Sequence, residues 1–142
     1  MTVAIARNHP AASAEINALR SAAWAEVGDQ DWEPILRRSL GWVCAVDGER
    51  LVGFVNVAWD GGVHAFLLDT TVHPDLQGRG IGTALVEEAT AMARDMGAEW
   101  LHVDFDDHLG SFYAACGFEP ASAGLIDLTG PTRVPKTPWQ RE

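Results

Sequence analysis

Long apolar runs and cysteines are scarce in this sequence of 142 residues, and each scarcity excludes a class of protein. No stretch approaches the roughly 18 consecutive apolar residues that a membrane-spanning helix needs. The two cysteines, Cys44 and Cys116, are too few for a disulfide framework or for a zinc site of the CxxC kind. No apolar run follows a basic stretch near the N-terminus, so no signal peptide is predicted. We therefore expect a cytoplasmic protein with no membrane span and no metal.

Positive charge is also scarce. Ten Lys and Arg residues stand against twenty Asp and Glu residues, which gives a formal net charge of −10. Binding to nucleic acid or to an anionic membrane requires a basic face, so the composition argues against both partners. The 47% of hydrophobic and 21% of charged residues are typical of one globular domain of ordinary size.

The chain alternates helix-like and strand-like segments. Strands are predicted over 2–6, 42–46, 51–59, 63–72, 100–105 and 124–128, and helices over 11–27, 32–40, 81–97 and 109–116. Asp-Gly pairs after Val46 and after Trp59 favour hairpin turns between the second, third and fourth strands. The order predicts an α/β fold, a mixed sheet with helices on its faces, as a single domain over 1–128. A proline-rich tail over 129–142 follows.

A glycine-rich turn stands between the predicted strand 63–72 and the predicted helix that begins at Ile81. Glycines at 78, 80 and 82 let the backbone bend and expose N–H groups with no Cβ in the way. Together with the positive end of the helix dipole, these N–H groups can bind phosphate. The turn is not a P-loop, because the only lysine is Lys136, and three strands precede it, unlike a dinucleotide fingerprint. By itself it fits a phosphate site or merely a tight connection.

Two segments resemble the motifs of the GCN5-related N-acetyltransferases, the GNAT family. Gln77-x-x-Gly80-x-Gly82 resembles the family's acetyl-CoA-binding motif, and the segment from Tyr113 to Gly117-Phe118 resembles its second hallmark. The resemblance implies the GNAT-like fold, in which a mixed, mostly antiparallel twisted sheet is flanked by helices. It also implies acetyl-CoA as co-substrate.

The resemblance assigns roles to individual residues. The backbone of Thr70, Thr71 and Val72 would hold the pantetheine arm, and a main-chain N–H at or next to Val72 would polarise the thioester carbonyl. The pyrophosphate would bind the turn formed by Gln77, Gly78, Arg79, Gly80, Ile81 and Gly82, with the Arg79 side chain as an added cation. Asp106 stands where the family often has Asn, and an ionised Asp accepts hydrogen bonds but donates none.

Tyr113, the only tyrosine, occupies the family's general-acid position, although its ring could simply pack under the turn at Gly117. A phenol with a pKa of about 10 can protonate a departing thiolate. Asp69 is the first choice for the base, because a carboxylate inside an apolar strand is costly unless it is used or paired. His102 with Asp104, on one face of the next predicted strand, and a water chain are the alternatives.

These roles predict an acetyl-CoA-dependent N-acetyltransferase in which a primary amine attacks the thioester directly. The alternative is a catalytically inactive acyl-CoA-binding or regulatory module of the same fold. Family members often form dimers, and the tail with Trp139 leaves a homodimer open.

Two stretches without Lys or Arg, 21–36 and 95–132, indicate the charge of the small-molecule or peptide acceptor. Their carboxylates are Glu26, Asp29, Asp31 and Glu33 in the first stretch, and Asp95, Glu99, Asp104, Asp106, Asp107, Glu119 and Asp127 in the second. A cleft edged by one sign of charge captures the opposite ion, so we expect a cationic acceptor. A solvated acidic surface without such a role is the alternative.

Overall fold

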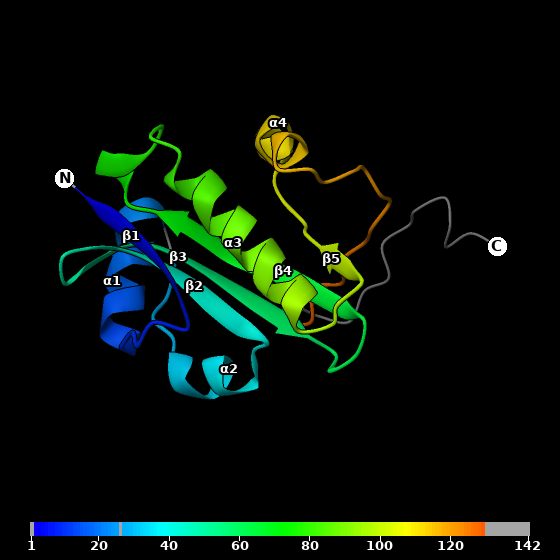
Figure 1. Ribbon diagram of the computed structural model, residues 1–142, viewed down its shortest axis with the longest axis horizontal. Helices are drawn as coiled ribbons and strands as arrows, with labels where there is room; N and C mark the ends of the chain where they lie inside the picture. Colours follow the sequence, from blue (N-terminus) through cyan, green and yellow to red (C-terminus); the bar gives the residue numbers. More distant parts are fainter. Residues whose placement is uncertain (1, 26, 130–142) are drawn as a thin grey trace.

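A five-stranded sheet in the order β1-β2-β3-β4-β5 forms the centre of the computed structural model, which describes residues 2–25 and 27–129 (Figure 1). The strands are β1 Val3–Arg7, β2 Gly41–Asp47, β3 Arg50–Trp59, β4 His64–Val72 and β5 Trp100–His102. Neighbours from β1 to β4 pair antiparallel, and β5 pairs parallel to β4. The predicted mixed, mostly antiparallel sheet is confirmed, whereas the tail over 130–142 lies outside the described residues.

The Asp-Gly pairs form the hairpin turns that the sequence predicts. Gly48 and Gly61 have φ angles of +62° and +81°, in the left-handed region that glycine adopts without a steric cost. The Asp60 carboxylate accepts a hydrogen bond from the Gly62 N–H at 2.7 Å. This bond lowers the pKa of Asp60, so the turn between β3 and β4 is also held by a charge-assisted hydrogen bond.

Helices cover both faces of the sheet (Figure 1). Helix α3, Ile81–Asp95, crosses one face and buries Leu85, Ala89 and Met92, which recur at helical spacing. Helices α1, Ser13–Ala23, and α2, Trp32–Arg38, pack on the opposite face against β2 and β3. The short helix α4, Gly110–Ala115, joins the α3 side of the core through Tyr113. No described helix is long and apolar enough to cross a bilayer.

Two predicted strands differ from the structure. The strand predicted over 100–105 ends at His102, and the segment 124–128 forms no strand, with Leu125 and Leu128 80% and 89% exposed. A short apolar run becomes a strand only where another strand pairs with its backbone. In the described chain β5 is the sheet edge on that side and is three residues long, so it offers little backbone to pair with.

Strands β4 and β5 separate after a short pairing. Their partners are His64 with Trp100, Ala65 with Leu101, and Phe66 with His102. Beyond Phe66, β4 continues to Val72, while the chain after β5 turns away toward α4 (Figure 1). In the described chain, one edge of β4 from Leu67 to Val72 therefore has no neighbouring strand.

Candidate active site

A β-bulge in β4 forms the centre of the site. The register of β3 and β4 shifts between Phe54 and Asn56, so that the single residue Val55 faces both Asp69 and Thr70. Asp69 has a φ of +61°, a left-handed conformation that is uncommon for residues other than glycine but tolerated by Asp. A bulge re-aims a side chain away from the regular alternation of a strand. Here it directs the Asp69 carboxylate toward α1, where its charged neighbour lies.

That neighbour is Arg20 of α1. The Arg20 Nη2 lies 3.9 Å from Asp69 Oδ1, which is too long for a hydrogen bond. Burial raises the pKa of Asp69 above its usual value, and the positive charge of Arg20 opposes that rise. A carboxylate with a raised pKa is a stronger proton acceptor than an exposed one.

A hydrogen bond from Trp24, the residue directly after α1, and one within β4 also fix the bulge. Trp24 Nε1 donates to Thr71 Oγ1 at 3.3 Å, and the Thr71 hydroxyl donates to the Asp69 carbonyl oxygen at 2.9 Å. The segment that follows α1 therefore begins beside the bulge. These bonds occupy the Thr71 side chain, and the residue is only 2% exposed.

The glycine-rich turn connects β4 to α3 through a short 3-10 helix, η1, over Pro74–Leu76. Gly78 and Gly80 have φ angles of +77° and +83°, and Gly80 is the N-cap of α3. The turn therefore needs glycine at both positions, and its N–H groups lie at the positive end of a 15-residue helix. The Gln77 side chain braces the turn against β4, since its Nε2 donates to the Val72 carbonyl at 3.1 Å.

Tyr113 approaches this region from α4. Its side chain is buried, its ring stacks on Phe105 at 4.7 Å, and Phe112 and Phe118 contact it edge-on. A Cβ on Gly82 would lie 3.4 Å from the Phe112 ring and 3.7 Å from Val72 Cγ2. The end of β4, the first turn of α3 and helix α4 therefore meet beside the unpaired edge of β4.

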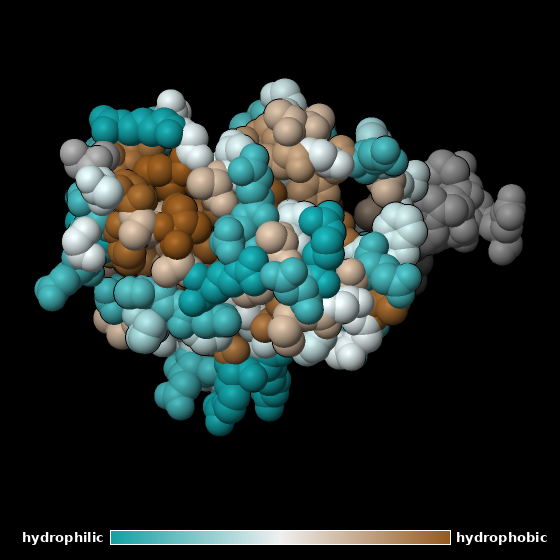
Figure 2. Space-filling model, viewed as in Figure 1, coloured by the Kyte–Doolittle hydropathy of each residue, from teal (hydrophilic) through white to brown (hydrophobic). Residues whose placement is uncertain are grey.

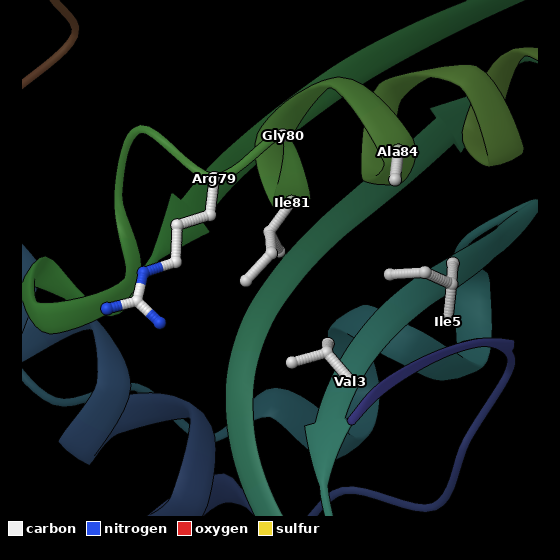
Figure 3. Close-up of a pocket in the computed structure, with 6 residues that line it drawn as sticks. All are labelled: Val3, Ile5, Arg79, Gly80, Ile81 and Ala84. Atoms are coloured by element: carbon white, nitrogen blue, oxygen red, sulfur yellow. The ribbon is translucent and has the colours of Figure 1, made fainter. Parts of the chain in front are cut away.

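A hollow of about 420 Å³ borders the same turn from the β1 side (Figure 3). It is lined by Val3, Ile5, Arg79, Gly80, Ile81 and Ala84. Hydrophobic side chains gather on the surface at this end of the molecule (Figure 2). The exposed Arg79 side chain stands among these apolar neighbours and brings a positive charge to the turn.

The remaining candidates lie along β5 and the segment after it. His102 Nε2 is 2.9 Å from His64 Nδ1, and the His102 ring stacks on Phe66 at 4.6 Å. The structure thus pairs His102 with another histidine rather than with Asp104, which is exposed. Asp106 is also exposed and precedes a second 3-10 helix, η2, over Asp107–Leu109. Its carbonyl oxygen, not its side chain, accepts the hydrogen bond from the Leu109 N–H at 2.8 Å.

Arg20 belongs to none of the motifs in the sequence, but its position in α1 relative to apolar residues indicates that it faces the sheet. It lies four residues after Ile16 and one after Leu19, both of which are buried. Residues at this spacing share one helix face, so an arginine there is directed toward the sheet. Such an arginine on an apolar helix face indicates a buried partner, here Asp69.

Residues 8–118 match the family model described as the acetyltransferase (GNAT) family. The chain belongs to this family. The predicted membership is therefore confirmed, and the matched range contains the bulge, the glycine-rich turn and Tyr113.

Curated relatives of this GNAT chain are matched over part of their length. Mycothiol acetyltransferase of Mycolicibacterium smegmatis is 34% identical over 97 residues, which cover 65% of this chain and 33% of the relative. An uncharacterized N-acetyltransferase, ycf52, of Porphyra purpurea is 32% identical over 69 residues, or 49% of this chain and 40% of the relative. The chain thus spans between a third and two fifths of the length of these two relatives.

Solved GNAT structures share the fold. A GNAT-family acetyltransferase of Streptococcus pneumoniae TIGR4 has a TM-score of 0.77 and 25% identity, covering 90% of this chain and 98% of that one. A family member of Brucella melitensis, solved in complex with acetyl-CoA, has a TM-score of 0.60 and 24% identity over 78% of this chain and 81% of that one.

The cysteines and the side chains of metal-ligating type are the remaining reactive groups of this GNAT chain. No group of three or more His, Cys, Asp or Glu side chains there could hold a metal ion. Cys44 is fully buried, and burial raises the pKa of its thiol to about 12, so it stays protonated at neutral pH. Burial also raises the pKa of Cys116. A thiolate nucleophile is disfavoured at both positions.

Gly80→Val is expected to raise the Kd for acetyl-CoA at least tenfold, a loss of about 1.4 kcal/mol. The substitution forces a β-branched residue into a left-handed conformation and places a side chain where the phosphates would approach. Isothermal titration calorimetry measures the change. Gly97→Val is the matched control, because Gly97 also has a left-handed φ, of +94°, but lies past the other end of α3. An unchanged Kd in folded Gly80→Val would contradict the phosphate assignment.

Proposed function

We propose that this chain transfers the acetyl group of acetyl-CoA to a primary amine. The observation that carries the proposal is the convergence at one end of β4. A bulged carboxylate and an unpaired strand edge in β4, the N-terminus of α3, and Tyr113 of α4 come from three separate elements and lie around the same segment. Membership in the GNAT family supports the same activity.

The cofactor would lie along the unpaired edge of β4. The pantetheine arm carries amide groups, which can bond the backbone of Thr70, Thr71 and Val72 much as an added strand would. Its pyrophosphate would bind the turn from Gln77 to Gly82, where N–H groups and the α3 dipole favour negative charge. Arg79 would place a positive charge beside the phosphates. Asp106, in the segment before α4, would accept a hydrogen bond from the cofactor.

The chemistry is a direct attack of the amine nitrogen on the thioester carbon. A carbon–nitrogen bond forms and the carbon–sulfur bond breaks, while a main-chain N–H at or next to Val72 stabilises the charge on the carbonyl oxygen. Asp69 accepts the proton that the attacking amine loses, and the Tyr113 hydroxyl gives a proton to the departing thiolate. The products are the acetylated amine and free CoA, and solvent returns the proton from Asp69 to Tyr113.

A cationic acceptor is the second part of the proposal. Asp104, Asp106 and Asp107 are exposed in the segment that joins β5 to α4, beside Tyr113. Other members of the acidic set have different partners: Asp31 caps α2, and Asp95 pairs with Arg7 at 2.8 Å. Glu26 lies outside the described residues. The carboxylates left near the site would attract a polyamine-like or aminoglycoside-like molecule or a basic peptide.

The salt dependence of the reaction tests the charge of the acceptor. The KM for a cationic acceptor is expected to rise several-fold between about 0.05 M and about 0.5 M NaCl, while the KM for acetyl-CoA rises less. Release of free CoA thiol, measured across a panel of amines, supplies both constants. A neutral amine serves as the control substrate. If a neutral or anionic amine is turned over best and salt has no effect, the acceptor is not selected by charge.

The same panel tests the activity itself. If acetyl-CoA binds but no amine releases CoA above the background rate, the chain is an acyl-CoA-binding module rather than an enzyme. A cytoplasmic setting is part of the proposal, and the net charge of −10 argues against nucleic-acid and anionic-membrane partners. Sedimentation equilibrium decides whether the chain forms a homodimer.

A further inference from the structure

The surroundings of Arg20 are unusual for an arginine in a surface helix. Its side chain is only 13% exposed, and in the described chain its Nη1 is the one buried side-chain nitrogen or oxygen without a hydrogen-bond partner. Arginine carries five N–H donors and is almost never buried unless it is paired. A buried guanidinium with an unused donor costs stability, so its position calls for a reason other than folding.

The Arg20 guanidinium packs on the face of the Trp32 ring. The Arg20 Cζ lies 5.2 Å from the centroid of the Trp32 ring, within cation–π range. The ring itself is immobilised, because Trp32 Nε1 donates to Asn17 Oδ1 at 3.0 Å and Phe54 packs edge-on at 5.4 Å. The cation–π contact therefore favours a position of the guanidinium on Trp32, beyond hydrogen-bond distance of Asp69.

This gap has a chemical consequence. A bidentate pair would fill the lone pairs of Asp69 with N–H donors and leave the carboxylate a poor proton acceptor. At 3.9 Å the two charges still attract, but no carboxylate oxygen is engaged by the guanidinium. The arrangement thus supplies charge to Asp69 and leaves its oxygens available to a substrate.

We propose that Arg20 is a positioning residue for Asp69: held on Trp32, it orients the carboxylate over the β4 bulge and keeps it ionised without bonding the oxygen that accepts the proton. The inference rests on the proposed role of Asp69 as the base. Of the elements packed around Asp69, α1 contributes Arg20, and β3 contributes the uncharged residues Phe54, Val55 and Asn56 opposite the bulge. Arg20 is the charged group of the described chain that acts on Asp69.

Arg20→Met and Arg20→Lys test the proposal through the pH dependence of kcat/KM. The base must be ionised, so activity rises with pH through the pKa of Asp69. Removing the positive charge raises that pKa, and the acidic limb of Arg20→Met is expected to move to higher pH by about one unit or more. Arg20→Lys restores the charge and should return the limb toward its original position. Arg38→Met removes a charge from an exposed position in α2 and is the matched control.

The carbon-13 resonance of the Asp69 carboxyl group provides a second measurement that needs no turnover. Its titration midpoint is expected to rise in Arg20→Met and to stay unchanged in Arg38→Met.

An Asp69 midpoint that is the same in Arg20→Met and the original chain overturns the proposal, whatever the activity. A moved midpoint with an unmoved activity limb overturns it as well, because Asp69 is then not the base. If the original chain acetylates no amine, the proposed function fails, and the resonance still shows whether Arg20 controls the charge of Asp69. Should Arg20→Met not fold, Arg20→Gln gives the same comparison.

Discussion

Tyr113→Phe is expected to lower kcat about 100-fold or more while the Kd for acetyl-CoA stays unchanged. The substitution removes a single hydroxyl group and keeps the ring, which packs against Phe105, Phe112 and Phe118. The fold and the cofactor path should therefore persist, while the departing thiolate loses its proton donor. Thiol release measures kcat, and calorimetry measures the Kd.

A packing control separates the hydroxyl from the ring. Phe118→Leu disturbs the same aromatic cluster but keeps the Tyr113 hydroxyl, so it should lower the melting temperature without a comparable loss of kcat. If Tyr113→Phe turns over at the original rate, the ring of Tyr113 serves packing alone and water protonates the thiolate.

Asp69→Asn is expected to lower kcat by about 100-fold or more and to remove the acidic limb of the pH profile. Asn has the shape of Asp and also tolerates a left-handed backbone, so the bulge should be retained. In the original chain, burial raises the pKa of Asp69, and the limb should lie above the usual range for an aspartate. The measurement is kcat/KM against pH at saturating acetyl-CoA.

The alternative bases are tested in the same series. Asp104→Asn removes an exposed carboxylate after β5, and His102→Gln removes the histidine that pairs with His64. Both should leave the pH profile intact. Full activity in Asp69→Asn together with a loss in His102→Gln would transfer the role of base to His102.

Local chemistry made part of the fold and of the site predictable. The Asp-Gly pairs specify hairpin turns because few other residues accept the backbone angles of such turns, and Gly78 and Gly80 specify the turn before α3 for the same reason. The helical spacing of Leu85, Ala89 and Met92 is predictive because these residues form one buried helix face.

Features that depend on two distant segments could not be predicted in this way. The left-handed φ of Asp69 arises from the register between β3 and β4, which no run of residues within β4 encodes. The apolar residues over 124–128 suggest a strand, but a strand forms only where a neighbouring strand offers backbone to pair with. The sequence predicts a strand over 100–105, whereas β5 ends at His102. The contact of Arg20 with Asp69 joins residues 49 positions apart, and only the packing of α1 on the sheet brings them together.

The bulged strand β4 divides the proposed site into two compartments. On one side Arg20 and Trp24 of the α1 region contact Asp69 and Thr71, and on the other side Val72 lies near Gly82, beside the Phe112 ring. Because successive strand residues point to opposite faces, substitutions in the α1 region at positions other than Arg20 and Trp24 can accumulate without altering the wall at Gly82 and Phe112. Under the proposed function, the surroundings of the base can evolve while cofactor affinity is conserved. A directed-evolution library confined to the positions of α1 other than Arg20 would exploit the same separation.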